Sequence, residues 1–196
     1  MMLIAYEALP DEAWTRLAQA ADDPTHPMRL FLLATVASDG SPDARLMVLR
    51  GADRQLGRIW FYTDRRSEKV DHLRQRPTIC AVAFDRQDGV QLRLRGTATI
   101  HESDTLADRH WSQTSTVVRA LYASPDPPGR PLRQPDPRLM TIKQALDAGA
   151  EVNARQNFTV IEAFVETIEW LQLTDDDQRR AIMHAATAWG VQPLAP

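Results

Sequence analysis

The chain has 196 residues, a formal net charge of −3, 43% hydrophobic residues and 25% charged residues, which is the composition of an ordinary globular protein with a substantial core. The slightly negative charge argues against a nucleic-acid-binding protein, and no apolar run reaches the length that crosses a membrane. Cys80 is the only cysteine, so an internal disulfide is excluded, and the N-terminus lacks the features of a secretory signal. We therefore expect residues 1–196 to form a single cytoplasmic domain.

The first third of the chain combines one short helix with three strand patterns. Residues 10–23 have apolar residues at helical spacing. Apolar, partly β-branched segments follow at residues 28–37, 43–51 and 58–64, and turns rich in glycine and aspartate separate them. Short hairpin-like connections of this kind predict an antiparallel sheet.

A second short helix is expected directly after the third strand. Ser67 can cap it, and the arginine–proline pair at 76–77 stops it. Two further strand patterns, at residues 78–85 and 90–101, predict another hairpin. Apolar and polar residues alternate in the second of these strands, which predicts one buried face and one polar face.

The second half of the chain is predicted to hold more helix. Residues 102–123 have a helical pattern, whereas residues 124–137 are rich in proline and charge and indicate a surface loop or a mobile flap. An amphipathic pattern at residues 138–150 predicts another helix, and residues 158–173 predict a long strand. The tail, residues 174–196, is ambiguous, because its propensity leans towards helix.

Together these patterns predict a mainly β protein of the α+β class, with about six antiparallel strands and flanking helices. A small barrel suits such a set of strands, because closure of the sheet removes its exposed edges.

The common catalytic motifs are missing from the sequence. It contains no GxGxxG, GxxxxGK[ST], GxSxG or HExxH pattern. The five histidines are scattered, so we expect no metal site. His110, which precedes Trp111, is interpreted as a half-buried helix residue and not as a catalyst.

Positive charge gathers in one part of the chain. Between Arg45 and Arg76 there are nine Arg and Lys residues against four Asp and Glu residues, an excess of five positive charges. Such a region can steer an anionic small molecule, although a solvated basic surface would have the same composition.

A phosphate site can be assembled around the start of the second helix. A helix N-terminus offers free N–H groups and a positive dipole end, and Ser67, Lys69 and Arg45 could add a hydroxyl and two cations. The alternative is that Ser67 is only a cap and both cations are solvated surface charges. Arg50 ends the strand that Arg45 begins, and residues five apart in a strand face opposite sides. Only a bulge or a bend would therefore let both arginines reach one ligand.

Taken in order, five segments resemble the pyridoxamine 5'-phosphate oxidase family of FMN-binding split barrels, and the resemblance is best over residues 11–124. The segments similar to the family's strands, turns and chain end are LLATVASDGSP (32–42), RLMVLRG (45–51), FYTD with SEK (61–69), VQLRLRG (90–96) and WGVQPLAP (189–196).

The resemblance implies a six-stranded antiparallel split β-barrel, FMN as the cofactor, and a homodimer with FMN at the subunit interface. It places the FMN phosphate against Arg45 and Lys69, and the flavin ring along the strand that begins at Arg45. The cofactor-binding residues that it implies are Arg45, Leu46, Met47, Val48, Leu49, Tyr62, Thr63, Ser67, Lys69 and Gln91.

Several positions depart from the family pattern. Glu68 stands where the family often has arginine, and Arg50 stands where it has a substrate-facing lysine. The tyrosine, arginine and serine that bind the substrate phosphate in the family are not kept in residues 108–118, and its C-terminal R.HDR pattern is matched only loosely at residues 178–184. Pyridoxamine 5'-phosphate is therefore expected to be a poor substrate or none. The candidate substrate residues are Arg50, Arg179, Arg180 and His184.

The resemblance implies an FMN-dependent oxidoreductase that acts on an unidentified small molecule, with the redox chemistry supplied by the flavin. The alternative is a flavin-binding protein without turnover, for storage or sensing, because the same fold can serve either purpose. A third interpretation is a small barrel that binds another phosphate-bearing ligand, such as a deazaflavin or a nucleotide.

Overall fold

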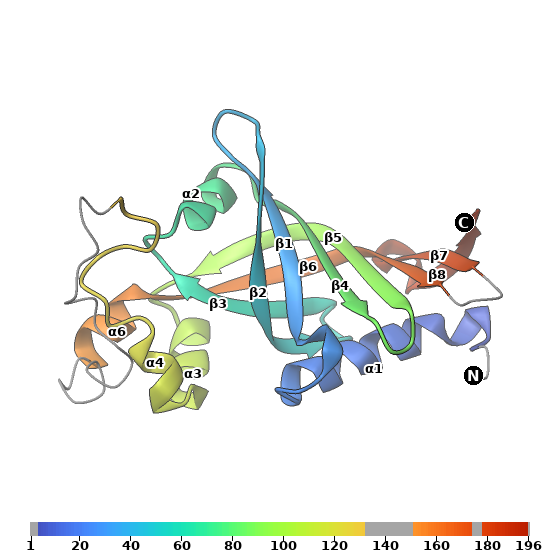
Figure 1. The fold of residues 1–196 in the computed structure, drawn as a ribbon, viewed down its shortest axis with the longest axis horizontal. Coiled ribbons are helices and arrows are strands. Elements are labelled where there is room, and N and C mark those ends of the chain that lie inside the picture. The colour runs from blue at the N-terminus through green and yellow to red at the C-terminus, as the bar shows by residue number, and fades with distance from the viewer. Residues whose placement is uncertain (1–3, 132–150, 174–177, 196) are drawn as a thin grey trace.

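The computed structural model describes residues 4–131, 151–173 and 178–195, and its centre is one antiparallel sheet (Figure 1). The strand order is β3-β2-β1-β4-β5-β6-β7-β8. The strands are β1 (Leu30–Val36), β2 (Pro42–Asp53), β3 (Arg58–Asp64), β4 (Thr78–Asp85), β5 (Val90–His101), β6 (Phe158–Leu173), β7 (Gln178–His184) and β8 (Gly190–Leu194).

A second pairing of β3, with β6, closes the first six strands into a barrel. This ladder runs from Arg58 opposite Phe164 to Asp64 opposite Phe158. On the same edge of β6, residues 158–164 pair with β3 and residues 167–173 pair with β7. One long strand therefore belongs both to the barrel and to the C-terminal hairpin. The predicted six-stranded antiparallel barrel with flanking helices is confirmed.

The tail, which was ambiguous in the sequence, is mainly extended over residues 178–195, against its helical propensity. β7 alternates buried and half-exposed residues, with Arg179, Ala181 and Met183 buried. A 3-10 turn (Ala185–Thr187) then leads into β8, which pairs with β7. Alanine and methionine favour helix intrinsically, but the edge of β6 offers a ladder of backbone hydrogen bonds. Tertiary pairing of this kind overrides a weak propensity.

The barrel interior and the first helix form the main hydrophobic core. The interior is filled by fully buried side chains such as Phe31, Phe61 and Leu92. Helix α1 (Leu9–Asp22) packs against β2 and buries Trp14 and Leu17, which lie on the apolar face that the helical spacing predicted.

The other helices lie around the barrel. They are η1 (Tyr6–Ala8), η2 (Pro27–Arg29), α2 (Glu68–Gln75), α3 (Thr105–Gln113), α4 (Thr116–Ala120) and α6 (Glu151–Asn157). Helices α3, α4 and α6 lie close together at one end of the barrel (Figure 1). A second apolar cluster includes Trp60 from β3, Phe158 from β6 and Tyr122, which follows α4.

The predicted helical segment 102–123 is confirmed as two short helices. The predicted loop, residues 124–137, contains no helix or strand over residues 124–131, and its remainder lies outside the described residues, as does the predicted helix at 138–150. Over the part of the chain that the structure describes, no helix is both long and apolar enough to cross a membrane.

The contact between β5 and β6 gives a test of the barrel. Their register shifts between Arg95 and Gly96, and a Cβ atom at Gly96 would lie 1.9 Å from the carbonyl oxygen of Phe164. Because backbone atoms of two paired strands cannot separate freely, Gly96→Ala should lower the free energy of unfolding by about 2–3 kcal/mol. Chemical denaturation followed by tryptophan fluorescence measures this loss.

The matched control is Arg95→Ala, at the exposed neighbouring position of the same strand. It should change the free energy of unfolding by no more than about 0.5 kcal/mol. Equal losses in the two variants would contradict a steric role for Gly96.

Candidate functional site

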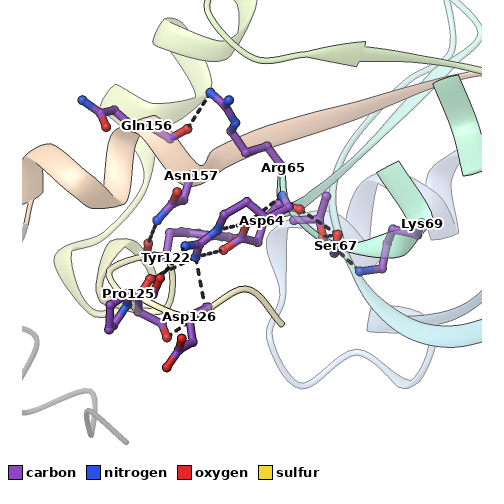
Figure 2. A network of polar contacts seen from close by, with 12 residues as sticks. Asp64, Arg65, Ser67, Lys69, Tyr122, Pro125, Asp126, Gln156 and Asn157 are labelled. Atoms are coloured by element: carbon purple, nitrogen blue, oxygen red, sulfur yellow. Dashed lines mark hydrogen bonds and ion pairs between the residues drawn. The ribbon is translucent and has the colours of Figure 1, made fainter. Parts of the chain in front are cut away.

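The turn between β3 and α2 gathers hydroxyl groups around an ammonium group (Figure 2). Ser67 Oγ donates to the carbonyl oxygen of Asp64 at 2.6 Å and lies 3.2 Å from Thr63 Oγ1. Lys69 Nζ donates to the same Thr63 oxygen at 3.2 Å. Ser67 is the N-cap residue of α2, but its side chain makes no capping hydrogen bond. The predicted side-chain cap is therefore wrong, because the hydroxyl turns back towards the end of β3.

Arg45 reaches the same end of the barrel from β2. Its guanidinium donates to Thr35 Oγ1 at 2.8 Å and forms an ion pair with Asp43. Thr35 Oγ1 also lies 3.1 Å from Nδ1 of His72, which is on α2 three residues after Lys69. The side chains of Arg45 and α2 thus meet around one buried hydroxyl.

Arg45, Thr63, Ser67 and Lys69 form what we call the cationic cradle. Burial lowers the pKa of the Lys69 ammonium, and the positive charge of Arg45 lowers it further. Two cations that are close together and partly buried repel each other, and the carboxylates of Asp64, Asp43 and Glu68 offset only part of that charge. A phosphate dianion would relieve the repulsion and accept hydrogen bonds from the hydroxyls, so these residues fit the phosphate end of FMN.

A buried hydroxyl near the cradle has no hydrogen-bond partner among the described residues. Thr159 on β6 is fully buried and lies directly opposite Thr63 in the β3–β6 ladder, so both side chains are on one face of the sheet. Leaving such a group unpaired costs about 1–3 kcal/mol. This end of the barrel can therefore accommodate a further polar group.

Sequence analysis did not identify Thr35, Asp43 and His72 as members of this group. Strand alternation carried a signal for Asp43, because residues two apart in a strand share a face and Arg45 follows two residues later. Helical spacing carried a signal for His72, three residues after Lys69. Thr35 had none, because only the pairing of β1 with β2 places it opposite Asp43.

From its start to Val48, one edge of β2 is open. β2 pairs with β1 from Pro42 to Val48, but it pairs with β3 only from Leu49 onwards. Over residues 42–48, the backbone edge that faces away from β1 has no strand partner in the described parts of the chain. Its N–H and C=O groups can therefore bind the polar edge of a flat ligand.

The open edge includes three of the predicted residues Leu46, Met47, Val48 and Leu49. Met47 and Leu49 point into the barrel core, whereas Val48 is half-buried and Leu46 is 65% exposed on the outer face. A ligand at this edge would therefore meet backbone groups and the outward side chains of Leu46 and Val48.

A second group of side chains lies where β2 bulges. The register between β2 and β3 shifts between Leu49 and Gly51, so Arg50 sits at the bulge. Its guanidinium carbon is 5.3 Å from the centre of the Tyr62 ring, a cation–π distance. Tyr62 precedes Thr63 of the cradle on β3. The sequence required a bulge or a bend in this strand if Arg45 and Arg50 were to reach one ligand, and the structure contains such a bulge.

Tyr62 is in turn hydrogen-bonded to α3. Its hydroxyl lies 2.9 Å from Nδ1 of His110, which is only 8% exposed and so more deeply buried than predicted. Burial raises the pKa of Tyr62, and burial together with the charge of Arg109 lowers the pKa of His110. Both shifts favour the uncharged forms of the two rings, which share one hydrogen bond between the phenol oxygen and Nδ1.

A pocket of about 360 Å³ lies beside this group. Strands β2 and β3 contribute Arg50, Asp53 and Trp60, α3 contributes Arg109, His110 and Gln113, and the last turns of α1 contribute Ala18, Ala21 and Asp22. Within the described ranges neither Arg50 nor Arg109 forms an ion pair with a carboxylate. The pocket therefore presents two guanidinium groups, the carboxylates of Asp22 and Asp53 and an aromatic surface, which suits a planar ligand with polar groups of both signs.

Gln91 lies far from the cradle within one chain. It is on the outer face of β5, and β1 and β4 stand between β5 and β2. Three strand spacings correspond to about 14 Å. The structure therefore does not bring Gln91 to the open edge of β2 in the same chain.

The predicted substrate residues Arg179, Arg180 and His184 are on β7 and do not line the pocket. Arg179 donates to the carbonyl oxygen of Ile4 at 2.5 Å, and its guanidinium carbon lies 4.4 Å from the centre of the Tyr6 ring. Arg180 pairs at 2.8 Å with the buried carboxylate of Glu169, which also pairs with Arg93. Both arginines thus have partners within the chain.

Comparison with known sequences agrees with this geometry. Residues 11–102 match the family model described as pyridoxamine 5'-phosphate oxidase, FMN-binding domain. A pyridoxine/pyridoxamine 5'-phosphate oxidase of Leptospira interrogans is 39% identical over 67 residues, which are 34% of this chain and 30% of that relative. The protein of the same name from Acaryochloris marina is 35% identical over 97 residues, 49% of this chain and 42% of that relative. The matched region thus spans less than half the length of these relatives.

Solved structures extend the likeness to the fold of the whole chain. A pyridoxamine 5'-phosphate oxidase-related, FMN-binding protein from Nostoc punctiforme superimposes with a TM-score of 0.75 at 24% identity, over all of both chains. PhzG from Burkholderia lata has a TM-score of 0.73 at 20% identity, over all of this chain and 98% of the other. FMN is the cofactor of the matched domain, so residues 11–102 resemble the FMN-binding domain of pyridoxamine 5'-phosphate oxidase, and the chain shares its fold with an FMN-binding protein related to that enzyme.

Proposed function

We propose that the protein is an FMN-dependent oxidoreductase that acts on a small anionic substrate. The observation that carries the proposal is the order of features along β2. The cationic cradle stands at Arg45, the open backbone edge follows, and the bulge at Arg50 adjoins the pocket. This order matches an elongated cofactor with a phosphate at one end and a flat ring at the other, next to a site for its substrate.

Bound FMN would supply hydride or electron transfer, and the chain would bind and orient both partners. Arg45 and Lys69 would hold the phosphate, with hydrogen bonds from the hydroxyls of Thr63 and Ser67. The backbone of β2 would hold the polar edge of the ring. Such fixed positioning is the main contribution that a protein makes to a reaction whose chemistry belongs to the cofactor.

The pocket residues would orient the substrate. Arg50 and Arg109 present charge to an anionic group, and Trp60 offers an apolar wall. Arg50 is itself placed by the ring of Tyr62, and the bond from Tyr62 to His110 fixes that ring against α3. Asp22 and Asp53 also line the pocket. We therefore infer a planar substrate that carries a carboxylate or a similar anion together with a hydrogen-bond donor or a cationic group.

We further propose that the protein is a homodimer with FMN between the subunits. The outer face of β1, β2 and β4 exposes large apolar side chains, Leu30, Leu32, Leu46 and Phe84, each at least 45% accessible. A contiguous apolar face of this kind is typical of an interaction site. Gln91 lies opposite Phe84 in the β4–β5 ladder, at the margin of that face. Contact between two copies there could bring Gln91 of the partner subunit to the site that it cannot reach in its own chain.

A flavin-binding protein without turnover is the second candidate. It is favoured by the engagement of Arg179 and Arg180, which bind Ile4 and Glu169 and are not free to hold a substrate. Reduction of the bound flavin by a donor distinguishes the two candidates.

The cradle gives the first test of this function. Lys69→Ala should weaken FMN binding about ten- to a hundredfold, because it removes a charge-assisted phosphate contact of about 1.5–3 kcal/mol. Asp43→Asn should tighten FMN binding severalfold, since it frees Arg45 from a competing carboxylate. Fluorescence titration of stripped protein measures both affinities.

Riboflavin, which lacks the phosphate, is the control ligand for the cradle. Its affinity should be lower than that of FMN and should stay the same in both variants. If Lys69→Ala binds FMN as the wild type does, Lys69 is only a surface cation.

The dimer gives the second test. Light scattering should report twice the chain mass of 22.1 kDa. Leu46→Asp should shift the protein towards monomer and weaken FMN binding, because it places a charge on the apolar face. Leu56→Asp is the matched control, since Leu56 is 53% exposed in the turn between β2 and β3. A monomeric wild type with FMN bound would rule out the shared site.

The third test concerns the substrate. Pyridoxamine 5'-phosphate should be oxidised poorly or not at all, whereas dihydro forms of aromatic carboxylates, which can donate a hydride, should bleach the flavin anaerobically, more slowly in Arg50→Ala. Pyridoxal phosphate formation in air at about one turnover per second or faster, with a micromolar KM, would show a true vitamin oxidase instead. Absence of bleaching by every donor would favour the second candidate.

A further inference from the structure

The turn between β3 and α2 is held by one acidic–basic pair. The carboxylate of Asp64 accepts a hydrogen bond from the backbone N–H of Arg66 at 2.8 Å. It accepts two more from the Nε and Nη2 of the same arginine, at 3.0 and 2.7 Å. Asp64 is buried and Arg66 half-buried, so the pair fixes the orientation of the guanidinium.

The same guanidinium also binds the segment that follows α4 (Figure 2). Arg66 donates to the carbonyl oxygens of Ser124 at 2.9 Å and Pro125 at 3.1 Å, and it makes a longer contact of 3.4 Å with that of Asp126. All three acceptors are main-chain oxygens. Because residues 124–131 contain no helix or strand, Arg66 provides hydrogen bonds that regular structure would otherwise provide.

The cationic cradle depends on the same turn. The hydroxyl and the N–H of Ser67 both donate to the carbonyl oxygen of Asp64, at 2.6 and 3.1 Å. Ser67 contacts Thr63, which in turn accepts from Lys69. The carboxylate of Asp64 therefore orients Arg66, which binds the loop, and the main-chain carbonyl of Asp64 binds Ser67 of the cradle.

We propose that Arg66 is a positioning residue that couples the order of residues 124–131 to the binding of a phosphate group in the cationic cradle. The inference rests on the proposed function, because the phosphate is that of FMN. Coupling of this kind is reciprocal: phosphate in the cradle stabilises the anchored loop, and loss of the anchor weakens phosphate binding by the same factor.

The adjacent Arg65 provides a matched control for charge. It lies in the same turn, but its side chain is exposed and, within the described ranges, donates only a long hydrogen bond of 3.5 Å to the carbonyl oxygen of Gln156. Its stronger contact is a backbone bond of 2.8 Å to Asn157, which a substitution of the side chain leaves in place. Arg65→Ala therefore removes the same charge near the cradle without removing the anchor.

The experiment compares wild type, Arg66→Ala and Arg65→Ala by flavin titration and by hydrogen–deuterium exchange of residues 122–131. In the wild type, FMN should slow exchange of this segment. Arg66→Ala should lower FMN affinity about tenfold, leave riboflavin affinity unchanged, and abolish the FMN-dependent slowing even at saturating FMN. Arg65→Ala should behave like the wild type in all three measurements.

A purely structural role for Arg66 would lower the affinities for both flavins together and keep the slowing of exchange at saturation, which would overturn the coupling. A wild type that does not prefer FMN to riboflavin would overturn the cradle itself, so the two failures are distinguishable. If Arg66→Ala does not fold, Arg66→Lys serves in its place. It keeps the charge but loses the planar fork that binds two carbonyl groups at once, and it should give the same loss of coupling.

Discussion

The pairing of β3 with β6 is the constraint on which the rest of the site depends. It fixes where β3 ends and hence where α2 begins. Because side chains alternate across a strand, it sends Phe61 and Thr63 to the interior and Trp60 and Tyr62 to the outer cluster. One strand thus contributes a hydroxyl to the cradle and an aromatic ring to the arginine beside the pocket. An open β3 would leave neither feature in a defined place.

The charges of the cradle are arranged before any ligand binds, and the carboxylate of Asp43 competes only weakly with a phosphate for Arg45. The side chain of Asp43 is 43% exposed, and a screened ion pair of this kind contributes about 0–1 kcal/mol. A phosphate contact with a partly buried cation contributes about 1.5–3 kcal/mol. The phosphate would therefore displace Asp43 from Arg45, while Asp43 would limit the charge repulsion of the empty cradle.

Local patterns predicted most of the strands, because alternation and turn residues are properties of adjacent positions. The tail stayed ambiguous in the sequence, since β7 is stabilised by an edge of β6 that no local pattern reveals. The same division holds in the site. Arg45, Ser67 and Lys69 could be found at strand and helix ends, whereas Thr35 joins them only through strand pairing.

Arg66 is the clearest case of a residue whose surroundings the sequence could not predict. In the sequence it is one of two adjacent arginines before a helix, and both have the character of surface charges. Its partners in the loop are main-chain oxygens nearly sixty positions away. Which oxygens these are depends on the path of the loop and not on residue type.

The closure of the barrel also sets an order of events during synthesis. Arg58 on β3 and its ion-pair partner Glu162 on β6 are 104 positions apart in the chain. While the chain emerges from the ribosome, β1 to β5 can form their hairpins, but the outer edge of β3 has no partner until β6 has been made. Contacts of such long range form slowly because the intervening loop must first be closed. The nascent protein therefore exposes an unpaired strand edge for much of its translation, and this is the stage at which a chaperone would protect it from aggregation.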